Sequence, residues 1–152
     1  MNTTTESLDG RPRRVDQLIT HYGLSHQNPG NELIHFIAIP LIMLSLVGML
    51  FALHPYVAYA FIAASMVYYA RLSMVFFITM LVGSMLTVAL VMAMGAQVLP
   101  VSVAIFIGAW ILQYMGHKME GKKPSFFEDI QYLWVGPLFV LSKLFGKLGI
   151  RW

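Results

Sequence analysis

Long apolar runs divided by short polar segments are the dominant pattern along this chain. The runs cover residues 33–53, 56–70, 72–94 and 101–115. Because a helix needs about 20 apolar residues to cross a hydrocarbon core of about 30 Å, we predict about four membrane-spanning helices. The second and third would be joined by a tight turn at Arg71. One kinked helix over residues 56–94 is the alternative.

Two further segments flank these spans. Residues 15–22 carry apolar side chains on one helical stripe, namely Val15, Leu18, Ile19 and Tyr22, with Asp16 and Gln17 on the other face. This periodicity predicts a short helix on the membrane surface, ended by Gly23. The later run 130–141 is short, is broken by Gly136-Pro137 and is followed by basic residues. It predicts a re-entrant or interfacial segment.

Composition agrees with this pattern, since 58% of the residues are hydrophobic and only 11% are charged, far from the balance of soluble domains. We therefore expect an all-α integral membrane protein, with residues 1–14 as a flexible basic arm and 15–152 as a single membrane-embedded helical domain. The absence of cysteine excludes disulfides and thiolate metal sites. The net charge of +3 is too small and too scattered to indicate nucleic-acid binding.

The positions of Lys and Arg predict the orientation. The basic arm, Arg71 and the lysines of 118–123 would all lie on one side of a four-span protein, whereas the turns at His54 and at 95–100 contain neither residue. Cytoplasmic flanks collect these residues, so we expect an integral membrane protein with this side in the cytoplasm. The membrane would be the inner membrane in a bacterium or the endoplasmic reticulum in a eukaryote.

Two polar segments carry the candidate chemistry, residues 26–35 and 113–120. His26 and His35 are nine residues apart and would point in opposite directions on one continuous helix, so they can share a ligand only if the chain breaks between them. Asn28-Pro29-Gly30 predicts such a break, with Asn31 as the cap of the following helix.

The second polar segment offers a matching set of groups. Gln113, His117 and Glu120 recur at i, i+4 and i+7 and therefore share one helical face. If the two segments meet, they would form a metal site, because ionisable groups at membrane depth are expensive and indicate function. The structural alternative is a pair of interfacial histidines bonded to carbonyls and a His117–Glu120 ion pair.

Other polar residues receive a structural interpretation. We expect His21 and His54 to be solvated. Lys122 and Lys123 would anchor lipid headgroups, with contact to an anionic substrate as the second role.

Taken together, these motifs resemble a membrane family known as metabolism-of-phytosphingosine-to-odd-numbered-fatty-acids proteins. The matching residues are Tyr22, His26, Asn28, Pro29, Asn31, His35, Ile39 and Pro40 near the start, and Trp110, Gln113, Gly116, His117, Glu120, Pro124, Gly136 and Pro137 near the end. One spacing departs from the family, which usually places its Glu four residues after the Gly-His histidine. Here Glu120 follows His117 by three.

The resemblance implies an Fe(II)-dependent dioxygenase that uses O₂ to remove one carbon from 2-hydroxy fatty acids. It implies His26, His35 and His117 as iron ligands, and Glu120 as a fourth ligand or as the proton acceptor from the substrate hydroxyl. Further polar side chains would orient the imidazoles or contact the substrate, namely Tyr22, Asn28, Asn31 and Gln113. Homo-oligomerisation is left open.

Two other functions are compatible with the same residues. A zinc-dependent membrane lipid hydrolase could use the histidines and Glu120, because neutral imidazole suits zinc as well as iron. A non-enzymatic protein that binds lipid or metal is the second. A transporter is disfavoured, because the ionisable residues gather at one face and not at the midplane.

Overall fold

The computed structural model describes residues 12–121 and 132–152, in which the regular elements are helices joined by short links. The elements are α1 (Arg14–Gly23), α2 (Pro29–Leu53), α3 (Pro55–Leu72), α4 (Met74–Ala93), the 3₁₀ turn η1 (Gly95–Gln97), α5 (Val98–Met119) and α7 (Val135–Leu148). These ranges contain no β-strand. The predicted all-α class is confirmed.

Three helical segments are long and apolar enough to cross a membrane: α2, α4 and the unit Gly95–Met119 that joins η1 to α5. The second of the four predicted spans, residues 56–70, corresponds to α3, which is 18 residues long and is not among these three. The predicted break near Arg71 is confirmed at Ser73, whose extended backbone separates α3 from α4. The single kinked helix is therefore wrong.

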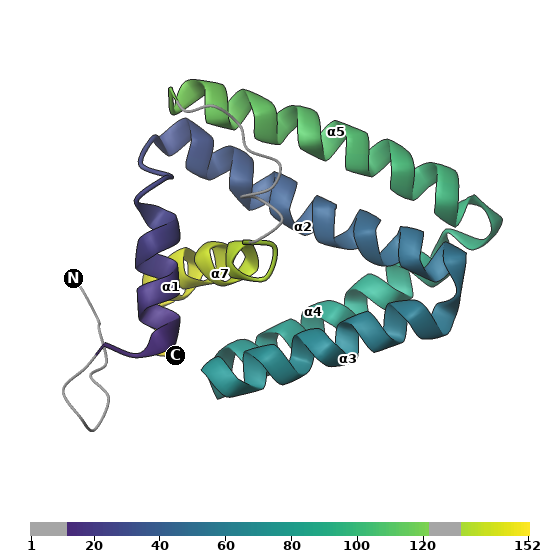
Figure 1. Cartoon of the computed structure of the whole chain (residues 1–152), viewed down its shortest axis with the longest axis horizontal. Helices are drawn as coiled ribbons and strands as arrows, with labels where there is room; N and C mark the ends of the chain where they lie inside the picture. The colour runs from purple at the N-terminus through teal and green to yellow at the C-terminus, as the bar shows by residue number, and fades with distance from the viewer. Residues whose placement is uncertain (1–11, 122–131) are drawn as a thin grey trace.

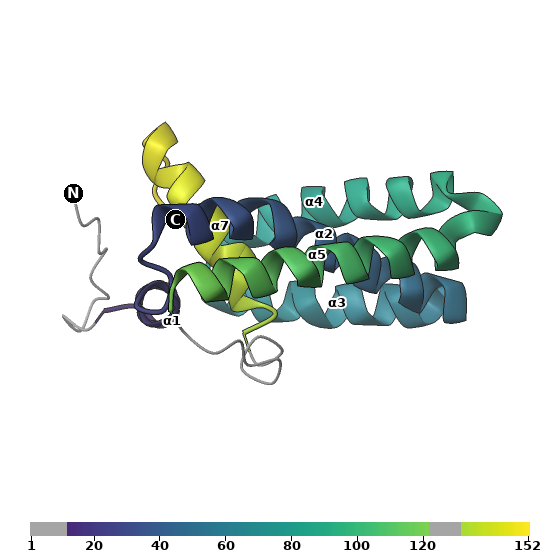
Figure 2. The same ribbon diagram turned by 90° about the horizontal axis from the view of Figure 1, so that it is seen from above.

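The helices form two antiparallel pairs that diverge toward one end (Figure 1). Helix α2 lies beside α5, and α3 lies beside α4. The turns at His54 and at η1 stand where the pairs converge, and α1 and α7 occupy the open end. Figure 2 shows the same arrangement from above, with α1 and α7 crossing the ends of the long helices.

Small residues allow α2 and α5 to approach closely. A Cβ atom on Gly48 would collide with the hydroxyl of Ser102, and one on Gly116 would collide with the amide oxygen of Asn31. Contacts of this kind let helix backbones pack tightly in a membrane protein. The Gly116 contact fixes the end of α5 against the beginning of α2.

The open end of the bundle has its own apolar core. Val15 of α1, Tyr69 of α3, Phe76 of α4 and Leu138 of α7 are fully buried together. The apolar stripe of α1 is therefore covered by protein. Asp16, which was predicted on the polar face, is also buried. Its carboxylate is satisfied there, because it accepts hydrogen bonds from the Trp152 indole at 3.0 Å and from Arg13 at 3.2 Å.

Helix α7 extends further than the apolar run suggested. It includes Lys143 and Lys147 and ends at Leu148, followed by the cap residue Gly149, whose positive φ of 69° suits glycine. At 14 residues it measures about 21 Å, which is shorter than a membrane span. The first residues of the predicted segment 130–141 fall outside the described ranges.

Candidate metal centre

The connection between α1 and α2 places the first histidine. Asn28, and not Asn31 as predicted, caps α2: its side chain accepts hydrogen bonds from the amides of Gly30 and Asn31. Pro29 takes the first helical position, where its fixed φ suits a helix and its missing N–H costs no hydrogen bond. The helix thus begins before Gly30, and His26 lies in the short link just ahead of it.

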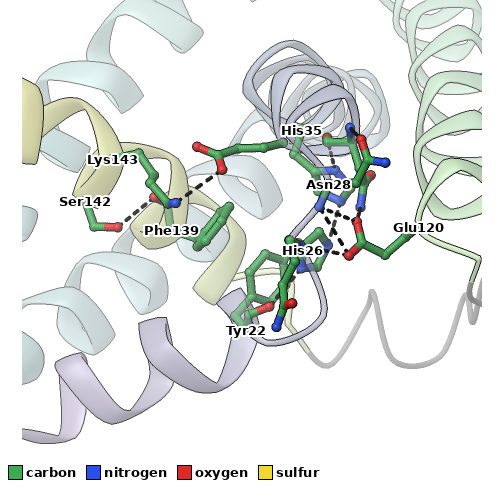
Figure 3. Close-up of polar contacts among 11 residues, drawn as sticks. Tyr22, His26, Asn28, His35, Glu120, Phe139, Ser142 and Lys143 are labelled. Atoms are coloured by element: carbon green, nitrogen blue, oxygen red, sulfur yellow. Dashed lines mark hydrogen bonds and ion pairs between the residues drawn. The ribbon is translucent and has the colours of Figure 1, made fainter.

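Three histidines converge at this link. His26 comes from the link, His35 from the second turn of α2 and His117 from the last turns of α5. One ring nitrogen from each lies within 4.8 Å of the other two. The residues are 5%, 0% and 8% exposed. The predicted meeting of the two polar segments is therefore present in the structure, and Figure 3 shows His26 and His35 at its centre.

Hydrogen bonds determine which nitrogens of His26 and His35 carry protons. The Nδ1 atom of His26 lies 2.8 Å from the Tyr22 carbonyl, and that of His35 lies 2.9 Å from the Asn31 carbonyl. A carbonyl only accepts hydrogen bonds, so each Nδ1 carries the proton and each neutral ring has its lone pair on Nε2. The second nitrogen of a metal-binding histidine usually makes this kind of bond.

The two Nε2 atoms face each other at 2.9 Å. Two lone pairs at this distance repel unless a cation or a proton lies between them. Metal–nitrogen bonds are about 2.1 Å long, so two nitrogens at this spacing could both bind one divalent cation.

His117 completes the group from the opposite helix. The centroid of its ring lies 5.9 Å from that of His26 and 5.6 Å from that of His35. The preceding residue is Gly116, whose missing side chain makes room for Asn31. The Gly-His pair therefore lets α5 approach α2 closely enough for the third imidazole to reach the other two.

Glu120 holds the two polar segments together. Its carboxylate accepts hydrogen bonds from the amide of Gln27 at 2.8 Å, from the amide of Asn28 at 3.0 Å and from Asn31 Nδ2 at 3.0 Å. Partial burial alone would raise the pKa of the Glu120 carboxyl, but these hydrogen bonds outweigh it and lower the pKa below its usual value. That Glu120 is a fourth ligand stays a prediction.

Aromatic side chains cover the histidines on the side of α1 and α7. The Tyr22 ring stacks on His26 with centroids 4.2 Å apart, and Phe139 lies against both rings at 5.2 and 5.7 Å. Lys143 lies over the outer face of Phe139 and forms an ion pair of 3.2 Å with Glu32 (Figure 3). This cover keeps water away from the imidazoles.

A small cavity lies beside this cover. Its lining includes four side chains with polar groups, Tyr22, Trp110, Gln113 and Tyr132, and apolar side chains such as Ile39 and Met43. Its volume is about 40 Å³, enough for a few non-hydrogen atoms. The amide oxygen of Gln113 is buried and has no hydrogen-bond partner among the described residues. A ligand in this cavity would supply one.

The predicted residues thus separate into distinct groups. The three histidines come together; Asn28, Asn31 and Glu120 form the clamp beside them; Tyr22 and Gln113 line the cavity. Lys122 and Lys123 fall outside the described residues. His21 and His54 are exposed, as predicted. Sequence reasoning missed Phe139 and Tyr132, because single aromatic residues in an apolar chain carry no distinguishing pattern.

Comparisons with known proteins bear on what this site is for. Residues 13–148 match the protein family described as 2-hydroxy-palmitic acid dioxygenase Mpo1-like. No curated protein and no solved structure matches the chain. The family match spans α1 to the end of α7 and includes every residue of the histidine cluster and its clamp. The chain therefore belongs to the Mpo1-like family of 2-hydroxy-palmitic acid dioxygenases.

Proposed function

We propose that this protein is an Fe(II)-dependent dioxygenase that shortens 2-hydroxy long-chain fatty acids by one carbon. The observation that carries the proposal is the pair of Nε2 lone pairs on His26 and His35, which face each other at 2.9 Å within reach of His117. The family description supports the substrate class. Three neutral imidazoles suit iron and leave other coordination positions for a substrate.

The placement in the membrane agrees with a lipid substrate. Between Leu33 and His117 the only charged residue is Arg71, which lies in the last turn of α3. That turn, the beginning of α2 and the end of α5 lie at the open end of the bundle (Figure 1). Because basic residues favour the cytoplasmic side, we propose that the site lies at the cytoplasmic face, where a fatty acid can keep its carboxylate near water.

The chemistry needs no further oxidant. A 2-hydroxy acid and one O₂ balance as the acid one carbon shorter, one CO₂ and one water. Iron held by His26, His35 and His117 would supply the electron transfer that O₂ requires. The chain's own part is to hold these imidazoles in one tautomer, to exclude water with Tyr22 and Phe139, and to present a polar group to the substrate.

We assign that last role to Gln113. Gln113 lines the cavity, and its amide oxygen, which is buried without a partner among the described residues, can accept a hydrogen bond from the substrate hydroxyl or from a protonated carboxyl. Asn28, Asn31 and Glu120 would act as positioning residues that fix the link carrying His26 against α5. Tyr22 would act through its stacking on His26.

The test is an anaerobic single-turnover assay. Purified protein in detergent is loaded with Fe(II), mixed with 2-hydroxypalmitic acid and exposed to O₂, and mass spectrometry measures the acid one carbon shorter. Wild type should form this product, whereas His26→Ala, His35→Ala and His117→Ala should form none. His54→Ala is the matched control, since His54 is exposed and caps α3 at the other end of the long helices, and it should retain activity.

Failure of wild type would overturn the proposal. If folded, iron-loaded protein leaves the hydroxy acid unchanged, the same preparation loaded with zinc should be assayed with ester and amide lipids. Hydrolysis there would identify the zinc hydrolase, the alternative that the same ligand set allows.

A further inference from the structure

A second hollow begins where the cavity beside the histidines ends. This groove lies between α2, α4 and α7 and has a volume of about 220 Å³. Ile39 and Met43 form part of its wall, and the same two residues line the cavity that contains Gln113. The two spaces are therefore neighbours on opposite sides of shared side chains.

The lining of the groove suits a hydrocarbon. Thr79 is the one residue with a polar side chain in its wall, and its hydroxyl already donates a hydrogen bond to the Val75 carbonyl within α4. Nothing else among the described lining residues offers a side-chain donor or acceptor. A polar ligand would lose its hydrogen bonds on entering, whereas an alkyl chain has none to lose.

The direction of the groove follows from α2. His35, Ile39 and Met43 are spaced at i, i+4 and i+8 and lie along one stripe of this helix. At 1.5 Å per residue, Met43 is about 12 Å further along α2 than His35. A molecule whose head lies at the histidines can therefore run along this stripe into the groove, away from the charged end of the bundle.

A wider groove between α3 and α4, of about 530 Å³, is the competing location. It is also apolar, and its wall includes Tyr59, Met66 and Met92. It shares no lining residue with the cavity beside the histidines. Continuity with the site therefore favours the groove between α2, α4 and α7.

We propose that this groove holds the acyl chain of the substrate and that Gly83 determines how long a chain it accepts. The inference rests on the proposed function. Gly83 lines the groove from α4, and a Cβ atom added to it would have no neighbour within 4 Å. Gly83 is also exposed on the apolar surface of α4, so the acyl chain can enter sideways from the bilayer.

A larger side chain at Gly83 should block the far part of the groove without disturbing the fold. We expect Gly83→Phe to lower kcat/KM for 2-hydroxyoctadecanoic acid by about tenfold or more, while 2-hydroxydecanoic acid is processed as by wild type. The control is Gly108→Phe on α5, which also enters open space but lines none of the described grooves. An unchanged chain-length profile in Gly83→Phe would overturn the proposal.

A binding experiment separates this proposal from the proposed function. A 2-hydroxy fatty acid with a diazirine at its last carbon is photolysed with metal-loaded protein under nitrogen, and labelled peptides are mapped. Labelling of Met80 or Leu141 that unlabelled acid prevents and Gly83→Phe abolishes supports the groove, whether or not wild type turns the acid over. Labelling confined to the α3–α4 groove, or equal in wild type and Gly83→Phe, contradicts it.

Discussion

The Nε2 atom of His26 lies 2.9 Å from the Nε2 atom of His35, although each ring donates its Nδ1 proton to a main-chain carbonyl. Two backbone carbonyls, those of Tyr22 and Asn31, thus orient the two rings so that their Nε2 lone pairs face each other. Without a metal ion or a shared proton between them, the two lone pairs repel each other. The simplest physical account is that the fold of the α1–α2 link is built for a bound metal.

Metal removal should therefore destabilise the protein. A metal present at about 100 times its Kd contributes about 2.7 kcal/mol to folding, and for a chain of this length each kcal/mol corresponds to about 2–4 °C. Chelation should lower the Tm in detergent by about 5–10 °C. The His35→Ala variant should show no response to the chelator, and a wild type that is equally insensitive would contradict a metal at this site.

Gly116 should tolerate no side chain. In Gly116→Ala the new Cβ would collide with the amide oxygen of Asn31, so we expect a loss of about 1–3 kcal/mol in the free energy of unfolding. Gly108→Ala is the matched control, since it lies on the same helix in open space, and it should be neutral or stabilise the helix by about 0.5–1 kcal/mol. Thermal unfolding of both variants measures the difference, and equal Tm values would refute the contact.

Glu120→Gln should weaken the clamp between the ends of α2 and α5. The substitution keeps the shape of the side chain but removes a charge-assisted set of hydrogen bonds, which should cost about 1–3 kcal/mol. Glu32→Gln is the control, because the Glu32 ion pair with Lys143 is exposed and should contribute less than about 1 kcal/mol. Chemical unfolding in detergent compares the two.

The same variant tests the lowered pKa of Glu120. A carboxyl with a lower pKa in the folded state stabilises the protein above its unfolded pKa of about 4.3. That contribution is lost as the pH falls through the folded value. The Tm of wild type should therefore fall more steeply than that of Glu120→Gln below about pH 4.5. Parallel curves would show that Glu120 is not held by these hydrogen bonds.

Gln113→Leu should separate stability from activity. The amide oxygen of Gln113 is buried without a partner among the described residues, and replacing such a group with an apolar one is neutral or stabilising. We expect an unchanged or higher Tm together with a loss of at least about tenfold in kcat/KM. Metal content should stay at the wild-type level, and full activity would exclude Gln113 from substrate binding.

Several of these features could be predicted from sequence, for identifiable reasons. The run lengths predicted the long helices, and the break at Asn28-Pro29-Gly30 predicted that His26 and His35 could meet, because turn chemistry is local. The cap of α2 was misplaced onto Asn31, since Asn28 and Asn31 are equally good caps and only the position of Pro29 in the helix distinguishes them.

Long-range contacts could not be predicted in this way. Two partners of Glu120 are backbone amides more than 90 residues away, and nothing in the local sequence identifies them. The burial of Asp16 depends on Trp152 at the far end of the chain. The cavity beside Gln113 is lined by residues of four helices, α1, α2, α5 and α7, and the local sequence of each helix does not show that these residues meet.

The most direct test of the histidine centre is an anaerobic titration of the purified protein with Fe(II), followed by metal analysis and X-ray absorption. Wild type should bind one iron per chain with imidazole ligands, and His26→Ala, His35→Ala and His117→Ala should each lose it. The exposed-histidine variant His54→Ala should bind iron as wild type does. Iron that binds equally well to His35→Ala, or an absorption spectrum without imidazole, would contradict the account.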